Sequence, residues 1–123
     1  MPIAPSELIL TDKGSIYHLD LRPEQIATTI ITVGDPDRVE LVSGYFDKVD
    51  YRVQHREFVT HTGMLGSKRI SVLSTGIGTD NIDIVLNELD ALVNVDFEKR
   101  EIKKEKISLD IIRIGTSGTI RSE

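Results

Sequence analysis

The sequence has 123 residues, of which 39% are hydrophobic and 28% charged, with a formal net charge of -5 and no cysteine. These values are typical of one globular domain with a hydrophobic core, and we expect a single domain over residues 1–123. The lack of cysteine excludes disulfides, thiolate metal sites and cysteine nucleophiles, and the acidic balance argues against a surface devoted to nucleic acid.

The amino-terminal sequence, MPIAPS, lacks the basic and apolar regions of a secretory signal. No apolar run approaches the roughly 20 residues that span a bilayer. A cytoplasmic protein without membrane contact is therefore expected. The three histidines, His18, His55 and His61, do not have the spacing of metal ligands, so no metal is expected either.

The first 25 residues are polar and interrupted by proline and glycine, which indicates an irregular arm that builds little core. Residues 28–33 form a β-branched run ended by Gly34, a pattern typical of a buried strand and its turn. Residues 37–46 carry apolar side chains at helical intervals behind Pro36, and proline suits the first turn of a helix.

The middle of the chain predicts three strands and a second helix. Residues 48–53, 56–62 and 68–74 have strand composition, and the last of these runs into a glycine loop. Residues 81–93 repeat apolar side chains at a period near 3.6, which predicts an amphipathic helix. The stretch 94–108 is rich in charge and poor in apolar side chains, which indicates a solvated excursion.

The last β-rich segment, residues 109–114, again runs into small residues, GTSG at 115–118. Three times, a β-rich segment ends in a small-residue loop, and twice a helix follows. This arrangement predicts an α/β fold with a mixed central sheet flanked by helices. Ligands of such folds gather outside the carboxyl ends of the strands, so the three loops are expected to converge.

Two of these loops have compositions that suit a small anion to different degrees. Residues 34–38, GDPDR, place the N–H groups of a helix start beside the Arg38 guanidinium, which suits an oxyanion. A capped turn with a solvated arginine explains the same string equally well. Residues 74–79, STGIGT, lack dinucleotide and P-loop spacing, so a nucleotide cofactor is disfavoured and a close-packing turn is the simpler interpretation.

Arg113 is the most informative position because it lies inside an otherwise apolar strand. A guanidinium keeps its charge, and its burial without an anionic partner costs several kcal/mol. The position therefore predicts an anionic ligand, with a structural salt bridge as the alternative.

Four strings, taken together, resemble the nucleoside phosphorylase superfamily in order and spacing, and its uridine phosphorylases in particular. They are GDPDR at 34–38, HREF at 55–58, STGIG at 74–78 and RIGTSG at 113–118. The resemblance covers essentially the whole chain and implies the amino-terminal half of that domain, apparently truncated. In the family, the base-recognition segment and the Glu-Met-Glu motif lie in the other, carboxyl-terminal half of the domain. Neither has a counterpart in this sequence.

The resemblance also implies roles for individual residues, but none for a catalytic group. By position, phosphate would be held by Gly34, Arg38, Arg56, Arg113 and Thr116. Of these, Arg56 would act across a dimer interface, and His18 would likewise reach the ribose of a neighbouring subunit. The implied active unit is a dimer or an assembly of dimers.

The implied reaction is phosphorolysis of a ribonucleoside to free base and ribose 1-phosphate, a pentosyltransferase step of nucleotide salvage. Inorganic phosphate is the co-substrate, and no cofactor is implied. The 123-residue chain is expected to be inactive alone. Two alternatives are a non-catalytic phosphate-binding or assembly module, and a purine nucleoside phosphorylase or nucleosidase of the same superfamily. The three arginines argue against the nucleosidase, because a hydrolase has no use for a phosphate clamp.

Overall fold

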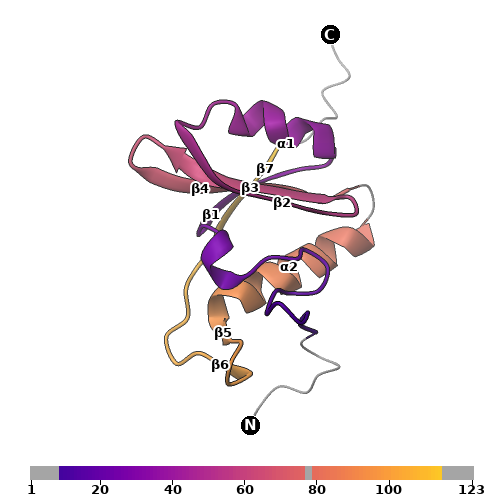
Figure 1. Ribbon diagram of the computed structural model, residues 1–123, viewed down its shortest axis with the longest axis vertical. Helices are drawn as coiled ribbons and strands as arrows, with labels where there is room; N and C mark the ends of the chain where they lie inside the picture. The colour runs from indigo at the N-terminus through magenta and orange to yellow at the C-terminus, as the bar shows by residue number, and fades with distance from the viewer. Residues whose placement is uncertain (1–8, 77–78, 115–123) are drawn as a thin grey trace.

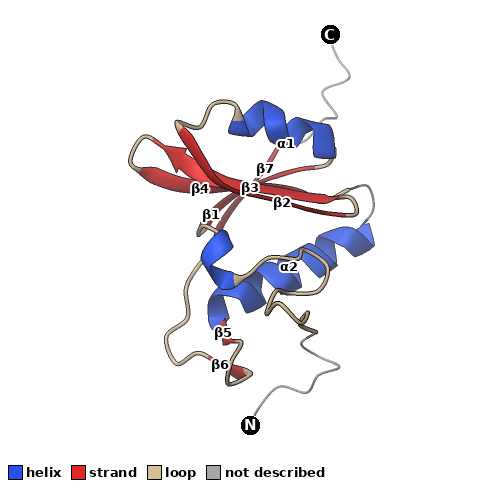
Figure 2. Cartoon of the chain, viewed as in Figure 1, coloured by secondary structure: helices blue, strands red, loops and turns tan. Residues whose placement is uncertain are grey.

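A five-stranded sheet forms the centre of the protein in the computed structural model, which describes residues 9–76 and 79–114 (Figure 1). Its strands lie in the order β2-β3-β4-β1-β7. In chain order they are β1 Thr29–Val33, β2 Lys48–His55, β3 Phe58–Leu65, β4 Lys68–Ser74 and β7 Asp110–Ile114. Helix α1 (Pro36–Ser43) covers one face of the sheet and α2 (Thr79–Asn94) the other (Figure 2). The expected α/β class, with a mixed sheet flanked by helices, is confirmed.

Strand direction places three carboxyl ends at one edge of the sheet. β1 runs parallel to β4 on one side and to β7 on the other, and Val33 lies opposite both Ser74 and Ile114. β2, β3 and β4 pair as antiparallel neighbours. The ends of β1, β4 and β7 therefore share the edge at which α/β folds bind their ligands.

Helix α1 begins where the sequence provides both a cap and a first-turn proline. The Asp35 carboxylate accepts a hydrogen bond from the Asp37 N–H at 2.9 Å, and Pro36 is the first helical residue. Val39 is fully buried against the sheet. The helix ends at Ser43, three residues before the predicted end, because two of the following N–H groups bond carbonyls three residues back instead of four.

Strands β2 and β3 form a hairpin whose turn lies two residues later than the sequence predicts. β2 continues to His55 and β3 begins at Phe58, so Arg56 and Glu57 form the turn. Arg56 has a φ of 57°, the left-handed conformation that tight hairpin turns require. The polar pair at 54–55 has the composition of a turn, but backbone pairing with β3 continues through it.

The amino-terminal arm contributes to the core, so the prediction that it builds little core is wrong. Ile16, Leu19 and Leu21 are at most 3% exposed and belong to one cluster with Val85 and Leu89 of α2. Figure 1 shows this indigo segment crossing α2. Its prolines and glycines prevent regular structure, but the apolar side chains between them still cover the apolar surface of the helix.

A short 3-10 helix, η1 (Pro23–Gln25), connects the arm to β1. Arg69 of β4 fastens this turn, because its guanidinium donates to the carbonyl oxygens of Glu24 at 2.6 Å and Ile26 at 3.0 Å. None of the described helices is long and apolar enough to cross a membrane.

The predicted solvated excursion, residues 94–108, is solvated mainly in its later part and contains a small hairpin, whereas Val95 at its start is buried in the core. β5 (Val95–Asp96) pairs with β6 (Glu101–Ile102), and residues 104–108 are all exposed. The buried Asn94 holds the returning chain: its Oδ1 accepts from the Ile107 N–H at 2.6 Å and its Nδ2 donates to the Ile107 carbonyl at 3.1 Å. This contact leads the chain back toward β7.

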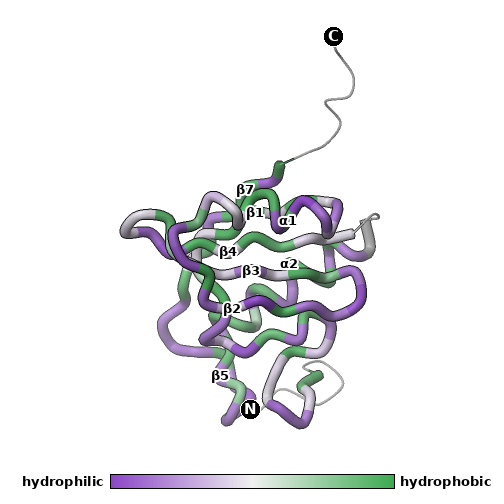
Figure 3. Tube along the Cα trace, turned by 45° about the horizontal axis from the view of Figure 1, so that its top comes forward, coloured by the Kyte–Doolittle hydropathy of each residue, from purple (hydrophilic) through white to green (hydrophobic). Residues whose placement is uncertain are grey.

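Strand β7 is exposed along its whole length. Among the described strands it pairs with β1 alone, and each of its five residues is exposed. Figure 3 shows it at the border of the sheet. The prediction that Arg113 is buried inside an apolar strand is therefore wrong. An apolar run indicates a strand, but burial depends on what covers its two faces, and neither α1 nor α2 buries this one.

Candidate functional site

The loops that follow β1 and β4 lie side by side at the carboxyl edge of the sheet. The Thr75 N–H donates to the Val33 carbonyl at 2.9 Å, and its hydroxyl lies 3.4 Å from the same oxygen. A Cβ built on Gly34 would lie 3.9 Å from the carbonyl oxygen of Gly76. The predicted convergence therefore holds for two of the three loops. The third, residues 115–118, lies outside the described residues.

Helix α1 starts at this edge and carries an exposed arginine in its first turn. The Arg38 N–H donates to the Asp35 carbonyl at 3.0 Å, which closes the turn. The Arg38 residue is exposed, and its guanidinium has no hydrogen bond or ion pair with any described residue. The first turn thus offers backbone donors, a positive helix end and a solvated guanidinium in one place, which is a suitable arrangement for an oxyanion.

The β2–β3 turn is fastened onto the second loop. The Ser74 hydroxyl donates to the Glu57 carbonyl at 2.7 Å and accepts from the Val59 N–H at 2.8 Å. This pair of hydrogen bonds places the turn, and with it the exposed Arg56, beside the STGIG string. Arg56 is therefore close to the STGIG loop, although it lies on a separate hairpin.

Gly76 is required where the turn approaches the loop. Its φ of 74° is in the left-handed region, and a Cβ there would lie 3.0 Å from both Glu57 Cγ and Asn81 Nδ2. Next to Gly76, the Asn81 side-chain amide donates a hydrogen bond to Glu57 Oε2 at 3.0 Å. A backbone hydrogen bond of Glu57 itself and then the Asn81 amide lower the pKa of the Glu57 carboxyl. Sequence reasoning missed this contact, because only the HREF string pointed to Glu57 and nothing pointed to Asn81.

Arg113 lies near the first loop, but on the surface. It pairs in register with Thr32, two residues before Gly34. Because the guanidinium is exposed, solvent stabilises its charge, and burial no longer provides an argument for an anionic ligand. What remains is its place at the edge where the β1 and β4 loops meet. Thr116, the other predicted phosphate ligand on this segment, lies outside the described residues.

His18 lies on the arm, where it contacts both α2 and the last residue of β2. Its imidazole Nδ1 lies 2.7 Å from Glu88 Oε2, and its carbonyl lies 2.8 Å from His55 Nδ1. Glu88 is nine residues after the first residue of α2, about 14 Å along the helix axis at the usual rise. His18 forms no hydrogen bond with the described residues of the GDPDR and STGIG loops, but its contact with His55 places it beside the β2–β3 turn. Within 9–76 and 79–114, no three His, Asp or Glu side chains form a group that could hold a metal.

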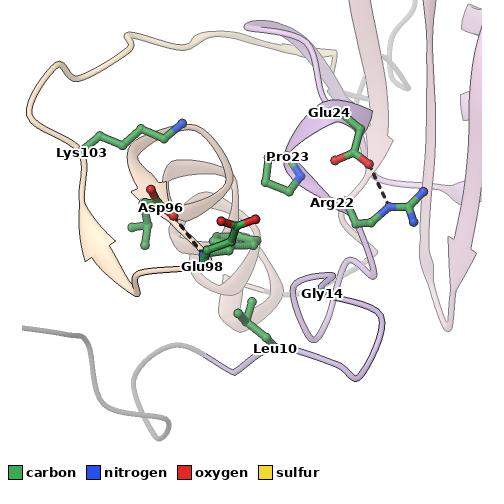
Figure 4. A pocket seen from close by; sticks show the side chains of 10 residues that line it. Leu10, Gly14, Arg22, Pro23, Glu24, Asp96, Glu98 and Lys103 are labelled. Carbon is green, nitrogen blue, oxygen red and sulfur yellow. Dashed lines mark hydrogen bonds and ion pairs between the residues drawn. The ribbon is translucent and has the colours of Figure 1, made fainter.

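A cavity of about 530 Å³ lies away from these loops, between the arm, η1 and the β5–β6 hairpin (Figure 4). Its walls carry both charge signs: Arg22 and Lys103 stand with Glu24, Asp96 and Glu98. Arg22 Nε is 3.1 Å from Glu24 Oε2. Since β5 follows the carboxyl end of α2 and the STGIG loop precedes its start, the helix separates this cavity from the loops.

The central sheet is of the α/β type, and the loops after β1 and β4 meet at the carboxyl ends of its parallel strands. Residues 28–123 match the phosphorylase superfamily, and the chain belongs to it. The uridine phosphorylases of Thermococcus kodakarensis and Escherichia coli are 34% and 36% identical to it, over 90% and 89% of this chain and 35% and 38% of their own lengths.

A comparison with a crystal structure shows the same similarity in the fold. The nucleoside phosphorylase of Trypanosoma brucei, whose structure is described as showing uridine phosphorylase activity, superposes with a TM-score of 0.81 at 38% identity. The match covers 89% of this chain and 38% of that one. The resemblance to uridine phosphorylases that four motifs indicated is confirmed. The chain spans little more than a third of the length of these relatives.

Proposed function

We propose that this chain supplies the phosphate-binding part of a nucleoside phosphorylase of the uridine phosphorylase type. In the reaction a phosphate oxygen bonds to the anomeric carbon of a ribonucleoside while the glycosidic carbon–nitrogen bond breaks. The products are ribose 1-phosphate and the free base, which takes up a proton. The observation that carries this proposal is the meeting of the GDPDR and STGIG loops at one sheet edge, with the start of α1 and Arg38 beside them.

The proposed site holds phosphate mainly by charge and position. Gly34 leaves the backbone open to the anion, the α1 terminus contributes its positive end, and Arg38 adds a guanidinium that can bind two phosphate oxygens. Arg113 would approach from the neighbouring strand β7, and Thr116 would follow it. Fixing an anionic nucleophile beneath the sugar lowers the barrier because the enzyme bears the entropic cost of alignment before reaction.

A second copy of the chain would complete the site. Arg56 is exposed on a hairpin turn, and the His18 side chain is 32% exposed. Exposed groups of this kind can reach into a neighbouring copy. We therefore assign Arg56 to the neighbour's phosphate and His18 to the neighbour's ribose, in a dimer or an assembly of dimers. Inorganic phosphate is the co-substrate, and no organic cofactor or metal is part of the proposal.

Calorimetric titration of inorganic phosphate into the 123-residue chain tests the proposal. We expect saturable binding that weakens about tenfold or more in Arg38→Ala and in Arg113→Ala, since a charge-assisted hydrogen bond contributes roughly 1.5–3 kcal/mol. Arg52→Ala removes an exposed guanidinium from β2 and serves as the matched control, with unchanged affinity. A folded wild-type chain that does not bind phosphate would contradict the proposal.

Activity is tested separately from binding. Uridine and inosine are incubated with phosphate and the chain, and ribose 1-phosphate is measured. Release from uridine in preference to inosine would support the pyrimidine assignment. Phosphate binding without ribose 1-phosphate is the result expected of the 123-residue chain alone, since it supplies only the phosphate-binding part, and a non-catalytic phosphate-binding module would give the same result. Base release that does not depend on phosphate would identify a nucleosidase.

A further inference from the structure

Glu88 of α2 receives an unusual number of hydrogen bonds from one short stretch of the arm. The His18 N–H lies 3.1 Å from both carboxylate oxygens, and the Leu19 N–H donates to Oε1 at 2.9 Å. The His18 ring is bound as well, with Nδ1 2.7 Å from Oε2. Two adjacent backbone amides and the imidazole thus share a single carboxylate. A role restricted to tethering the arm would need the backbone contacts alone.

The environment of the pair differs between its two members. The Glu88 side chain is 12% exposed, whereas the His18 side chain is 32% exposed. Both line a cavity of about 200 Å³ whose other walls are largely apolar, with Ile16 and Ile84 among them. Hydrogen bonds to a carboxylate are stronger where water is scarce. The carboxylate is therefore a firm anchor, while part of the imidazole stays open to solvent.

Two further contacts hold the histidine from other sides. The His55 Nδ1–H of β2 donates to the His18 carbonyl at 2.8 Å. The Tyr17 ring meets the His18 ring edge to face, with 4.9 Å between the ring centroids. Backbone and ring are thus fixed by residues from the arm, β2 and α2.

The chemistry of the contact determines which ring nitrogen carries the proton. A carboxylate only accepts hydrogen bonds, so Nδ1 of His18 must donate to it. In the neutral ring Nε2 is then left with its lone pair, ready to accept a hydrogen bond. Without a partner at Nδ1, imidazole in water favours the opposite tautomer, with the proton on Nε2.

We propose that Glu88 is a positioning residue, which holds His18 in the Nδ1–H tautomer so that Nε2 accepts a hydrogen bond from a sugar hydroxyl. This rests on the proposed function, in which His18 contacts the ribose of the neighbouring subunit. A ribose hydroxyl is a good donor, and an Nε2 with a lone pair is the acceptor that it requires. Glu88 itself does not touch the sugar.

Glu88→Gln separates the positioning role from a structural one. The glutamine oxygen can still accept from the His18 and Leu19 N–H groups, so the arm stays tethered. Its amide group is a donor, however, and opposite Nδ1 it favours the tautomer with the proton on Nε2. Asp83→Asn is the matched control, because Asp83 is an exposed acid on the same helix.

The readout is the tautomer of His18 in the isotope-labelled chain, taken from two-bond proton–nitrogen correlation spectra of the imidazole rings. We expect the Nδ1–H pattern in the wild type and in Asp83→Asn, and the Nε2–H pattern in Glu88→Gln. An Nε2–H pattern in the wild type, or an Nδ1–H pattern that survives in Glu88→Gln, would overturn the assignment of Glu88. Circular dichroism confirms that each variant is folded.

A titration with ribose 1-phosphate, followed at the same ring signals, tests the link to the sugar. We expect the His18 signals to shift to saturation in the wild type, and the affinity to fall about five- to tenfold in Glu88→Gln, as for one lost hydrogen bond. If His18 has the Nδ1–H tautomer but does not respond to ribose 1-phosphate, the ribose role in the proposed function fails and the tautomer assignment stands. If His18 responds equally in wild type and Glu88→Gln, the positioning role fails and the ribose role stands.

Discussion

His61 is a buried histidine whose surroundings favour its neutral form. It is 9% exposed, and its Nδ1 lies 2.8 Å from the Ser43 hydroxyl. Burial first, and then the positive charge of Arg52, lower its pKa below the ordinary 6.5, while Glu40 acts in the opposite direction. The folded protein therefore takes up this proton less readily than the unfolded chain does.

This difference makes stability depend on pH in a defined direction. Above the unfolded pKa, His61 is neutral in both the folded and the unfolded state, and its titration does not change the stability. As pH falls from 6.5 toward the lowered folded pKa, the unfolded state binds the proton first, and the stability of the folded state decreases. We expect the urea midpoint of the wild type to fall between about pH 7.5 and 5.5, in the range where histidine titrates. The decrease should be smaller in His61→Asn. If the urea midpoint changes equally with pH in the wild type and in His61→Asn, His61 does not cause the decrease.

Gly76 provides a second test at the scale of one residue. An alanine there must adopt a φ of 74° and lies 3.0 Å from the Glu57 and Asn81 side chains. We expect Gly76→Ala to lose about 1–2 kcal/mol from backbone strain, and to lose further stability from the disturbed Glu57–Asn81 hydrogen bond, measured by chemical denaturation.

Gly14→Ala is the matched control for this change. Gly14 has a φ of 79°, but a Cβ there meets nothing within 4 Å among the described residues. Gly14→Ala should lose only the stability that backbone strain costs, and its phosphate affinity should be unchanged. Gly76→Ala should also bind phosphate more weakly. Equal stability losses in the two variants would indicate that the contact with the β2–β3 turn contributes nothing.

At the scale of elements, the strands and helices followed from local patterns, and their ends followed less well. β4 lies over the predicted residues 68–74, and α2 extends the predicted 81–93 by two residues at its start and one at its end. The hairpin turn was misplaced because a polar pair such as Gln54-His55 occurs in turns and in solvent-facing strands alike. Backbone pairing with β3, which no local pattern contains, decided between them.

The start of α1 is the element whose local chemistry can be tested most directly. The Asp35 carboxylate accepts from the Asp37 N–H at 2.9 Å. We expect Asp35→Ala to lose about 1 kcal/mol of stability, and Asp35→Asn to retain most of it because an amide oxygen also caps. Thermal denaturation of both variants provides the measurement. A stability for Asp35→Ala equal to that of the wild type would rule out a stabilising cap.

At the scale of the whole molecule, the arm is part of the core on the α2 side of the sheet. Leu19 is fully buried there. We expect Leu19→Ala to cost about 2–5 kcal/mol, the usual range for such a truncation in a core. Leu41→Ala, at a residue that is 68% exposed on α1, should change stability by less than about 0.5 kcal/mol. A Leu19→Ala protein as stable as Leu41→Ala would mean that the arm is dispensable.

The sequence by itself determined the α/β class, the superfamily, and the meeting of the first two loops, because strand and helix periods and small-residue loops are local properties of the chain. Only the tertiary structure decided that Arg113 is exposed and that the arm is buried. Both outcomes depend on which surfaces cover a segment, and those surfaces come from distant parts of the chain. For the same reason only the fold could bring Glu88, seventy residues away in sequence, to His18.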